Sequence, residues 1–519
     1  MRKPLLLGID AGTSVVKTVV FDEDGREIAV SRERVPVETT RPNWAEQDMD
    51  LVWSAVKKTV SRCLKGHGIS ASDIAGVGVA GQGDGCRLVD SHLRPVRKAV
   101  LWTDGRAGEI VRRWEQDGSA LSSFHICGSA IFSGAPAAVL EWLRRNEPDS
   151  LARAAHFLFA KDWIKLKLTG RIITDPSDAS RAPFDIRKRG YSPDLFEMLG
   201  LSSYFRLFPE ISEASEVIGE VTREAARETG LRVGTPVTNG MIDVVACGVG
   251  VGAINHGQAY SIIGTTCFNG VIMDRVELKP VGVGMTLAYA FDEQTLRSMP
   301  SLAGTPNLDW FIDRFCPQEK EKAAKEKLDL YALLEDEVSR VPVGCEGIIY
   351  HPYINPGGER APFVKPSAVA QFFGLSLRHS RWHLLRSVYE GVALSMVDCF
   401  DHIPVSVSNL MVCGGGAESP LWCQIVSDAT GRAVSIPKGS EFGALGVSIT
   451  TGLATGVYRD KGEAVKRTVS VGATFEPNME NHRKYQELSR LYRSLYRHVW
   501  DDWDLRAEIL GRVTSGTRP

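Results

Sequence analysis

Two short segments, far apart in the chain, share one pattern in which an apolar run ends in a turn of glycine and hydroxyl residues. They are Gly8–Ser14 (GIDAGTS) and Ser261–Thr266 (SIIGTT). Glycine permits the tight backbone of such a turn, and its N–H groups and hydroxyls can then face phosphate oxygens. A strand followed by Gly-Thr is common, so each copy alone is a weak signal. The duplicated pattern predicts two strand-based lobes that together hold one nucleotide phosphate chain, as in a kinase.

The turns supply the predicted phosphate-binding residues. Asp10 stands just before the first turn and is the predicted magnesium ligand, because Mg²⁺ beside a triphosphate usually takes only one or two protein carboxylates. Neither turn is a P-loop, which needs Gly-Lys-Ser/Thr, and no Gly-x-Gly-x-x-Gly follows the first strand. The predicted phosphate contacts are Gly12, Thr13, Ser14, Lys17, Gly264, Thr265 and Thr266.

Length and charge restrict the class of protein. At 519 residues the chain exceeds the size at which one core stops growing, so two principal domains are expected. A formal charge of −2 gives no reason to expect nucleic-acid or membrane partners. No signal peptide is recognisable and no apolar run reaches the ~18 residues of a membrane span, so the expected location is cytoplasmic. Ten cysteines without paired Cys-x-x-Cys spacing predict reduced thiols and no structural zinc.

Strand and helix patterns alternate along the first half. Leu5–Asp10, Val15–Asp22 and Glu27–Arg34 predict an antiparallel three-stranded meander. Apolar spacing over Gln47–Leu64 predicts a helix with an aspartate near its start as the cap. Ile74–Ala80 reads as a buried strand, and its carboxyl end is where ligands sit in open α/β sheets.

The second half repeats this scheme. Strands are predicted at Ala259–Ile263 and Asn409–Val412, with a helix at Trp382–Phe400 between them. Asn481–Trp500 predicts a C-terminal helix that packs on the second lobe. The predicted domains are therefore residues 1–252, with the acceptor and the first phosphate loop, and residues 253–519, with the nucleotide.

Two longer motifs carry a resemblance to a known family. Gly414–Arg432 (GGGAESPLWCQIVSDATGR), followed by Glu441–Gly446 (EFGALG), resembles the C-terminal signature of the FGGY carbohydrate kinases, and Phe159–Gly170 (FAKDWIKLKLTG) resembles their N-terminal signature. The resemblance covers nearly the whole chain. It implies an α/β fold of two RNase H-like lobes, as in the actin, hexokinase and Hsp70 ATPases, with an interlobe cleft.

The resemblance also implies ATP and Mg²⁺ as cofactors. Three glycines after a strand let the backbone lie flat against a planar group, and in FGGY kinases that group is the adenine and ribose of ATP. Glu418 stands where the family usually has a basic or small residue, which is a departure at the nucleotide edge. The implied nucleotide contacts are Gly414, Gly415, Gly416 and Ala417.

Asp243 is the predicted catalytic base. Its segment, Asn239–Gly248, is apolar apart from this one carboxylate. Transfer to a hydroxyl needs a group that accepts the hydroxyl proton. The local sequence alone is equally compatible with a helix N-cap. The resemblance favours the base, because FGGY kinases place their catalytic aspartate in the matching Gly-x-x-Asp segment, and Asp243 is then also close to the acceptor.

The acceptor loop departs from better-known relatives. It reads Gly-Gln-Gly-Asp-Gly at Gly81–Gly85, where xylulose-kinase-like members have Gly-Gln-Met-His-Gly and glycerol-kinase-like members have Gly-Gln-Arg-Glu. Trp102–Arg106 resembles the family's Trp-x-Asp-x-Arg loop, although an exposed turn with a surface ion pair is the alternative. Asp178 stands where relatives often carry Asn. The predicted acceptor contacts are Gln82, Gly83, Asp84, Trp102, Asp104, Arg106, Phe132 and Asp243.

The expected activity is ATP-dependent phosphorylation of a primary hydroxyl of a small polyol or sugar. The acceptor loop looks most like that of erythritol kinases, with L-xylulose kinases next, so erythritol is favoured over a ketopentose such as D- or L-xylulose. A catalytically silent sugar sensor is the alternative of another class. A chaperone or filament protein of the same architecture is disfavoured, because no stretch remains for a peptide-binding domain. Homodimers occur in the family, and no segment here dictates one.

Overall fold

The structure, a computed structural model, describes residues 3–515 and divides them into two compact units. The first unit contains the described residues up to His256 together with Ile272–Arg297 and Lys438–Ser470. The second contains Gly257–Val271, Ser298–Pro437 and the chain from Val471 onward. The sequence predicted two contiguous domains with a boundary after residue 252. The first break lies close to that position, but two later segments return to the first unit.

The first unit is built on a seven-stranded sheet in the order β13-β14-β5-β1-β2-β3, with β15 also paired to β5. The predicted meander is confirmed, because β1 pairs antiparallel with β2 and β2 with β3. β5 runs parallel to β1, and β14 and β15 run parallel to β5. The strands are β1 Leu5–Ala11, β2 Val15–Phe21, β3 Glu27–Arg34, β5 Ile74–Gly81, β13 Val217–Glu220, β14 Pro236–Thr238 and β15 Met241–Ile242.

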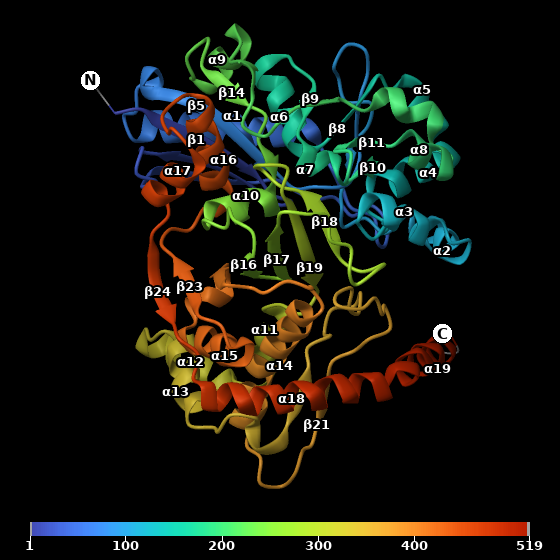
Figure 1. Ribbon diagram of the computed structural model, residues 1–519, viewed down its shortest axis with the longest axis vertical. Coiled ribbons are helices and arrows are strands. Elements are labelled where there is room, and N and C mark those ends of the chain that lie inside the picture. The colour runs from blue at the N-terminus through green and yellow to red at the C-terminus, as the bar shows by residue number, and fades with distance from the viewer. Residues whose placement is uncertain (1–2, 516–519) are drawn as a thin grey trace. The chain divides into compact units, whose positions relative to one another are not determined.

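Glycines in β1 and β5 explain how the returning segment covers this sheet. α16 (Phe442–Ala454) lies beside β1 and β5, as Figure 1 shows. A Cβ atom at Gly8 would collide with the carbonyl oxygen of Ala444, and one at Gly78 would lie 2.5 Å from that of Val447. Because these glycines have no side chain, the backbone of α16 can pack directly against the backbone of β1 and β5. The opposite face buries apolar side chains of α1 (Met49–Gly66), which Asp48 caps as expected.

Smaller elements complete the first unit. The helices are α2 Gly108–Gln116, α3 Ser119–Cys127, α4 Pro136–Asn146, α5 Pro148–Arg153, α6 Ala160–Thr169, α7 Pro176–Ala179, α8 Pro193–Met198, α9 Arg223–Thr229, α10 Asp243–Gly250 and α17 Lys461–Thr468. The short strands are β4 Glu46–Gln47, β6 Arg87–Val89, β7 Ala99–Val100, β8 His156–Leu158, β9 Ile173–Thr174, β10 Phe184–Asp185, β11 Gly190–Tyr191, β12 Glu210–Ile211 and β18 Met285–Ala288.

A second seven-stranded sheet has the order β18-β19-β17-β16-β22-β23-β24. β16 pairs antiparallel with β17 and parallel with β22, which repeats the way β1 pairs with β2 and β5. Each predicted phosphate turn therefore follows the same kind of strand. The strands are β16 Gln258–Ile263, β17 Cys267–Met273, β19 Thr295–Ser301, β22 Asn409–Cys413, β23 Val434–Pro437 and β24 Val471–Phe475, and β20 Ile349–His351 pairs separately with β21 Gln371–Phe373.

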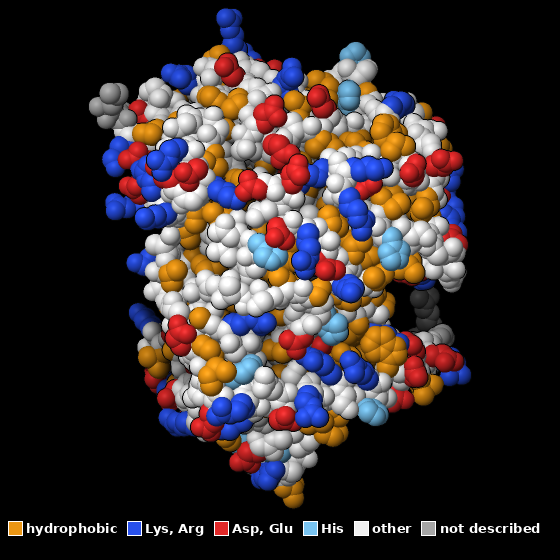
Figure 2. Space-filling model, in the orientation of Figure 1, with side chains coloured by type: hydrophobic (Ala, Val, Ile, Leu, Met, Phe, Trp, Pro, Cys, Tyr) orange, Lys and Arg blue, Asp and Glu red, His pale blue; other side chains and the backbone are white. Residues whose placement is uncertain are grey.

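Helices pack around this second sheet. The predicted helices are confirmed as α14 (Arg381–Asp401) and α18 (Met479–His498), and α18 lies along α14 and α15 (Figure 1). The other helices are α11 Pro306–Phe315, α12 Pro317–Glu326, α13 Leu330–Ser339, α15 Pro420–Thr430 and α19 Trp500–Ser515. None of the described helices is long and apolar enough to span a membrane. Basic and acidic side chains are interspersed over the face shown in Figure 2.

Candidate active site

The carboxyl ends of three parallel strands bring the predicted acidic residues of the first unit together. Ala11 at the end of β1 pairs with Gly81 at the end of β5, and Ile242 of β15 pairs with that same Gly81. Asp10 lies on the first strand, and Asp243 follows the third. Because these ends share one edge of the sheet, the two carboxylates and the acceptor loop after β5 occupy one region.

Asp243 carries the strongest electrostatic signal in this region. It is half-buried, begins α10, and accepts a hydrogen bond from the N–H of Val244 at 2.7 Å. Burial and the negative charges of Asp10, Asp178 and Asp84 together raise its pKa to about 8, although the hydrogen bond from Val244 lowers it. A carboxyl group with a pKa near neutrality suits the base predicted here, because it can take up a proton at working pH. The same residue also occupies the first turn of a helix.

Asp10 has the environment expected of a magnesium ligand. Its Oδ1 atom is buried and has no hydrogen-bond partner among the described residues. Burial raises the pKa of Asp10, and the charge of Lys17 lowers it. Within the described part of the chain, no group of three or more His, Cys, Asp or Glu is placed to hold a metal. A single carboxylate with an unpaired oxygen still fits a hydrated Mg²⁺, which keeps most of its waters.

The first turn connects to the acceptor loop through Thr13. Its hydroxyl donates to Oε1 of Gln82 at 2.9 Å and accepts from the indole N–H of Trp102 at 2.9 Å. Phosphate binding by this turn stays a prediction, and the Thr13 hydroxyl holds two predicted acceptor residues in place. Lys17 lies on β2, and its ammonium group pairs with Glu441 at 2.9 Å. Sequence reasoning missed this partner, which comes from the segment that returns to the first unit.

Gly83 does not leave an empty space in the acceptor loop. A Cβ atom there would collide with Cδ1 of Ile242, so the glycine makes room for the residue before Asp243. Asp84 follows with a positive φ of 57° and is buried. Its two carboxylate oxygens each lie 3.0 Å from Nε of Arg181. Arg181 was missed because it is 97 residues away, and its guanidinium lies 5.9 Å from the ring centre of Phe132.

Asp104 and Arg106 are paired with each other beneath the Trp102 loop. Nε of Arg106 lies 2.8 Å from Asp104, and neither side chain is exposed. Arg106 also pairs with Glu46 at 2.7 Å and lies 3.9 Å from the ring centre of Trp44. The alternative of a surface ion pair is therefore wrong, because this pair is buried. Their charged groups hold the loop, and contact with an acceptor stays a prediction.

A buried charge network lies behind the acceptor loop. The Lys161 ammonium is 2.9 Å from Asp162, 3.0 Å from Asp175 and 2.9 Å from Asp178, although neither oxygen of Asp178 makes a well-aligned hydrogen bond among the described residues. Burial raises the pKa of Asp178 to about 7. A Cβ atom at Gly83 would lie 3.6 Å from Oδ1 of Asp178. Asp178, which stands where relatives often carry Asn, therefore lies close to the acceptor loop.

The second predicted phosphate turn lies in the second unit. Gly264 donates its N–H to the carbonyl of Thr266 at 2.9 Å, and its own carbonyl accepts from the N–H of Thr305 at 2.7 Å. Thr265 is exposed at the tip. A Cβ atom at Gly304 would collide with this turn, so glycine is needed for the close approach. The turn is therefore held by the segment Gly304–Thr305, and Thr265 at its tip is accessible.

A cavity of about 570 Å³ opens in the second unit beside the triple glycine. Gly415, Gly416 and Glu418 line it, together with the aromatic side chains of Tyr389 and Trp422. Its size and its flat glycine wall fit a purine base and ribose. Gly414 is not among the lining residues, and neither is Ala417. Gly414 has a positive φ of 88° and packs against the backbone of Ile263.

Comparison with known proteins agrees with these features. A family model described as the N-terminal domain of the FGGY family of carbohydrate kinases matches residues 5–250, and the model of the C-terminal domain matches residues 259–455. The chain is 32% identical over 517 residues to erythritol kinase of Brucella abortus (strain 2308), covering 96% of this chain and 97% of the relative. It is 29% identical over 496 residues to L-xylulose/3-keto-L-gulonate kinase of Escherichia coli (strain K12), covering 94% and 96%.

Solved structures confirm the fold. Ligand-bound xylulose kinase from Lactobacillus acidophilus superposes with a TM-score of 0.89 at 22% identity, and the match covers 96% of this chain and 99% of that one. At this identity the likeness concerns the fold alone. The predicted two-domain α/β architecture of sugar kinases is thereby confirmed.

Proposed function

The chain belongs to the FGGY family of carbohydrate kinases, and from this premise we propose that it transfers the γ-phosphoryl group of ATP to a primary hydroxyl of a small polyol, with erythritol as the preferred acceptor. The observation that carries the chemistry is the pKa of Asp243, raised to about 8 beside Asp10 and the acceptor loop. The choice of acceptor is supported by the Gly-Gln-Gly-Asp-Gly loop and by the erythritol kinase relative.

Asp243 takes the proton of the attacking hydroxyl. Its raised pKa makes the carboxylate a stronger base than an exposed aspartate, which favours proton uptake as the oxygen bonds to phosphorus. Asp10 would hold Mg²⁺, which supplies charge stabilisation at the phosphates when Mg·ATP is bound. Both side chains act on the same reaction from neighbouring strand ends.

Asp84 orients the acceptor. Arg181 fixes the position of its carboxylate, whose oxygens can accept hydrogen bonds from vicinal hydroxyls. Trp102, fixed through Thr13, forms an apolar wall next to it. The nucleotide is assigned to the second unit, with the turn Gly264–Thr266 on its phosphates and the cavity beside Gly415 around its base and ribose.

The test is ADP release from Mg·ATP with erythritol, threitol, glycerol, ribitol, D-xylulose, L-xylulose and D-ribulose as acceptors. Selective turnover of erythritol supports the proposal, and phosphorus NMR of the product would identify the modified carbon. Selective turnover of L-xylulose would keep the kinase and reject the acceptor, an outcome favoured by the 29% identical L-xylulose/3-keto-L-gulonate kinase. A protein that binds an acceptor and ADP but turns over none of the panel would instead be a sugar sensor.

A further inference from the structure

The second predicted phosphate turn, Gly264–Thr266, rests on the short segment that connects β19 with α11. This segment is Leu302–Thr305, and its Gly304 allows a close approach, because a Cβ atom there would collide with the carbonyl oxygen of Gly264. The same oxygen accepts a hydrogen bond from the N–H of Thr305 at 2.7 Å. The position of the turn therefore depends on where this segment lies.

Glu359 fixes the beginning of this segment, because its carboxylate accepts four hydrogen bonds from two parts of the chain. The donors are the hydroxyl of Ser301 (2.8 Å) and the backbone N–H groups of Leu302 (2.9 Å), Arg360 (2.8 Å) and Ala361 (3.3 Å). The Ser301 hydroxyl in turn accepts from the N–H of Ala303 at 3.0 Å. One side chain thus ties the end of β19 and the first two residues of the segment to residues 359–361.

The carboxylate of Glu359 lies inside the second unit. Glu359 is 1% exposed, and burial raises its pKa, whereas its four hydrogen bonds lower it. Several hydrogen bonds are what a buried carboxylate requires to offset its desolvation. A group this deeply buried does not touch a nucleotide, so its effect on a ligand passes through the backbone that it holds.

We propose that Glu359 is a positioning residue for the phosphates of ATP, and that it holds the turn Gly264–Thr266 in place through Leu302–Thr305. This inference rests on the proposed function, which assigns that turn to the phosphates. A displacement of about 1 Å in groups that position a reacting phosphoryl group can lower the rate by about 10²-fold. Loss of Glu359 therefore impairs binding and transfer of the phosphates, whereas the base and ribose, which are assigned to the cavity beside Gly415, are still bound.

The experiment compares the equilibrium dissociation constants of adenosine and Mg·ADP in the wild-type chain and in Glu359→Ala. Adenosine carries the base and ribose without the phosphates, so the ratio of its dissociation constant to that of Mg·ADP reports on the turn. We expect this ratio to fall by about tenfold or more in Glu359→Ala, and kcat to fall by about 10²-fold. Unfolding of part of the sample lowers the amount of competent protein for both ligands and leaves the ratio unchanged.

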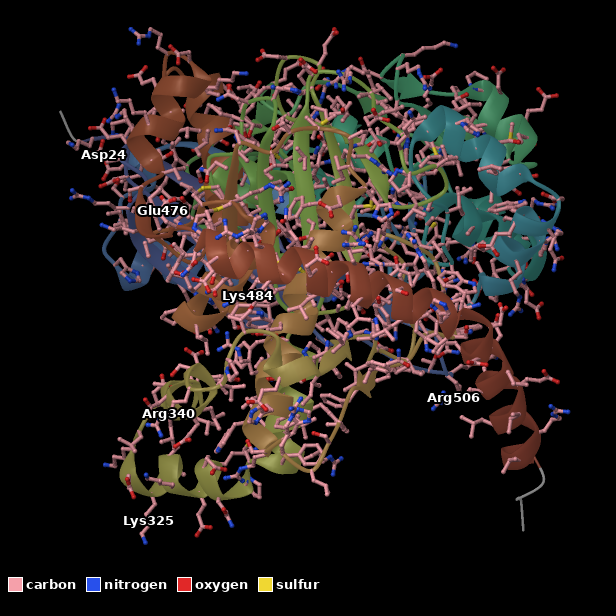
Figure 3. All side chains as sticks on the ribbon, turned by 60° about the horizontal axis from the view of Figure 1, so that its bottom comes forward. Asp24, Lys325, Arg340, Glu476, Lys484 and Arg506 are labelled. Atoms are coloured by element: carbon pink, nitrogen blue, oxygen red, sulfur yellow. The ribbon has the colours of Figure 1, made fainter. Side chains whose placement is uncertain are left out.

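Glu359→Gln is expected to restore most of the ratio and of kcat. Its amide oxygen can replace Oε1 as the acceptor of the backbone N–H groups, and its NH₂ group can donate to the Ser301 hydroxyl. Glu476→Gln is the matched control, because it makes the same chemical change in an exposed residue of the same unit, in the connection between β24 and α18 (Figure 3). It should leave the ratio and kcat unchanged.

Hydrogen exchange gives a readout without a ligand. We expect faster amide exchange in the peptide that contains Gly264–Thr266 in folded Glu359→Ala than in the wild-type chain. If Glu359→Ala does not fold, Ser301→Ala takes its place, because it removes one donor to the carboxylate and the acceptor of the Ala303 N–H. It should change the ratio and the exchange in the same direction, but less.

An unchanged ratio in the folded variant would overturn the proposal and leave the proposed function intact. An equal weakening of both ligands has that meaning too, and it would assign Glu359 to the stability of the second unit alone. A wild-type chain that binds adenosine as tightly as Mg·ADP would instead reject the phosphate assignment of the turn, which is part of the proposed function.

Discussion

At the scale of single residues, replacing Asp243 is the most direct test of the proposed chemistry. Replacing it with Asn keeps its size and its hydrogen bond to Val244 but removes the proton acceptor. We expect kcat to fall by about 10²- to 10⁴-fold with little change in Mg·ADP affinity. Steady-state kinetics and calorimetric binding of Mg·ADP measure the two quantities. Full turnover in the variant would remove Asp243 as the base.

The raised pKa of Asp243 gives a pH dependence of definite sign. The base works when it is ionised, so kcat/KM rises with pH and levels off above the pKa, which is about 8 in the ligand-free protein. The negative charge of Asp10 raises the pKa of Asp243, and a magnesium ion bound to Asp10 would offset that charge. We therefore expect a lower apparent pKa in the pH profile of kcat than in that of kcat/KM. Profiles from pH 5.5 to about 9.5 measure both limbs. A profile that is flat over this range would contradict the assignment.

Asp84 and Arg181 are expected to act as one unit. Arg181→Met removes the cation that faces both oxygens of the buried Asp84 carboxylate, which costs several kcal/mol and disorders the loop. We therefore expect a large rise in the KM for the acceptor and an unchanged KM for ATP. Asp84→Asn combined with Arg181→Met should be more stable than Arg181→Met alone, because it removes the buried charge that has lost Arg181. Additive effects in this double-mutant cycle would show that the pair is not coupled.

Sequence reasoning located a side chain in the fold correctly where the local motif itself determines the position of that side chain. Asp10 and Asp243 each follow or end an apolar strand, and the structure brings both to one edge of the sheet. It failed where a partner is remote, as with Arg181 for Asp84 and Glu441 for Lys17. Ion pairs across such separations leave no local pattern, because they depend on how the chain returns.

At the scale of elements, α10 and α16 cross in the first unit with their backbones in direct contact. A Cβ atom at Gly446 would collide with the carbonyl oxygen of Ala246, and one at Gly250 would collide with that of Phe442. Because α10 starts at Asp243, the position of this proposed base depends on the crossing. The glycines at this contact thus allow the close packing of the two helices that positions Asp243.

Gly446→Ala tests this crossing. The added methyl group forces the helices apart, so we expect a loss of about 1–3 kcal/mol in the free energy of unfolding and a lower kcat. Urea unfolding and steady-state kinetics measure both. Gly66→Ala is the control, since that helical glycine has nothing within 4 Å of its added Cβ. It should leave activity unchanged and stabilise by up to about 1 kcal/mol. Equal effects of the two substitutions would contradict a role for the crossing.

Most elements were predictable because their patterns are local. The meander, α1, β5, β16, β22, α14 and α18 follow from alternation, apolar period and capping. The glycines of β1 and β5 were visible in the sequence as well, but their purpose was not, since the helix that covers them lies more than 350 residues further on. A close approach between remote elements cannot be inferred from either one alone.

At the scale of the whole molecule, the predicted acceptor residues and the first predicted phosphate turn belong to one unit, whereas the second predicted turn and the triple glycine belong to the other. We therefore expect turnover to require both ligands, with ATP hydrolysis in the absence of acceptor below about one hundredth of the kinase rate. Phosphate release without acceptor, compared with ADP release in its presence, measures the ratio. The Asp243→Asn variant controls for contaminating ATPase, because it should lower both rates. An equal rate with and without acceptor would reject this dependence.

The return of Lys438–Ser470 to the first unit sets an order of events during synthesis. β1 and β5 leave the ribosome long before α16, which is made only after residue 441. At about 5–20 residues per second, the glycine-lined face of the first sheet waits on the order of 20–70 s for its covering helix. A nascent chain stopped at residue 256 thus has an apolar, backbone-exposing surface, which is what chaperones bind. The first unit is therefore the earliest to begin folding and among the last to finish.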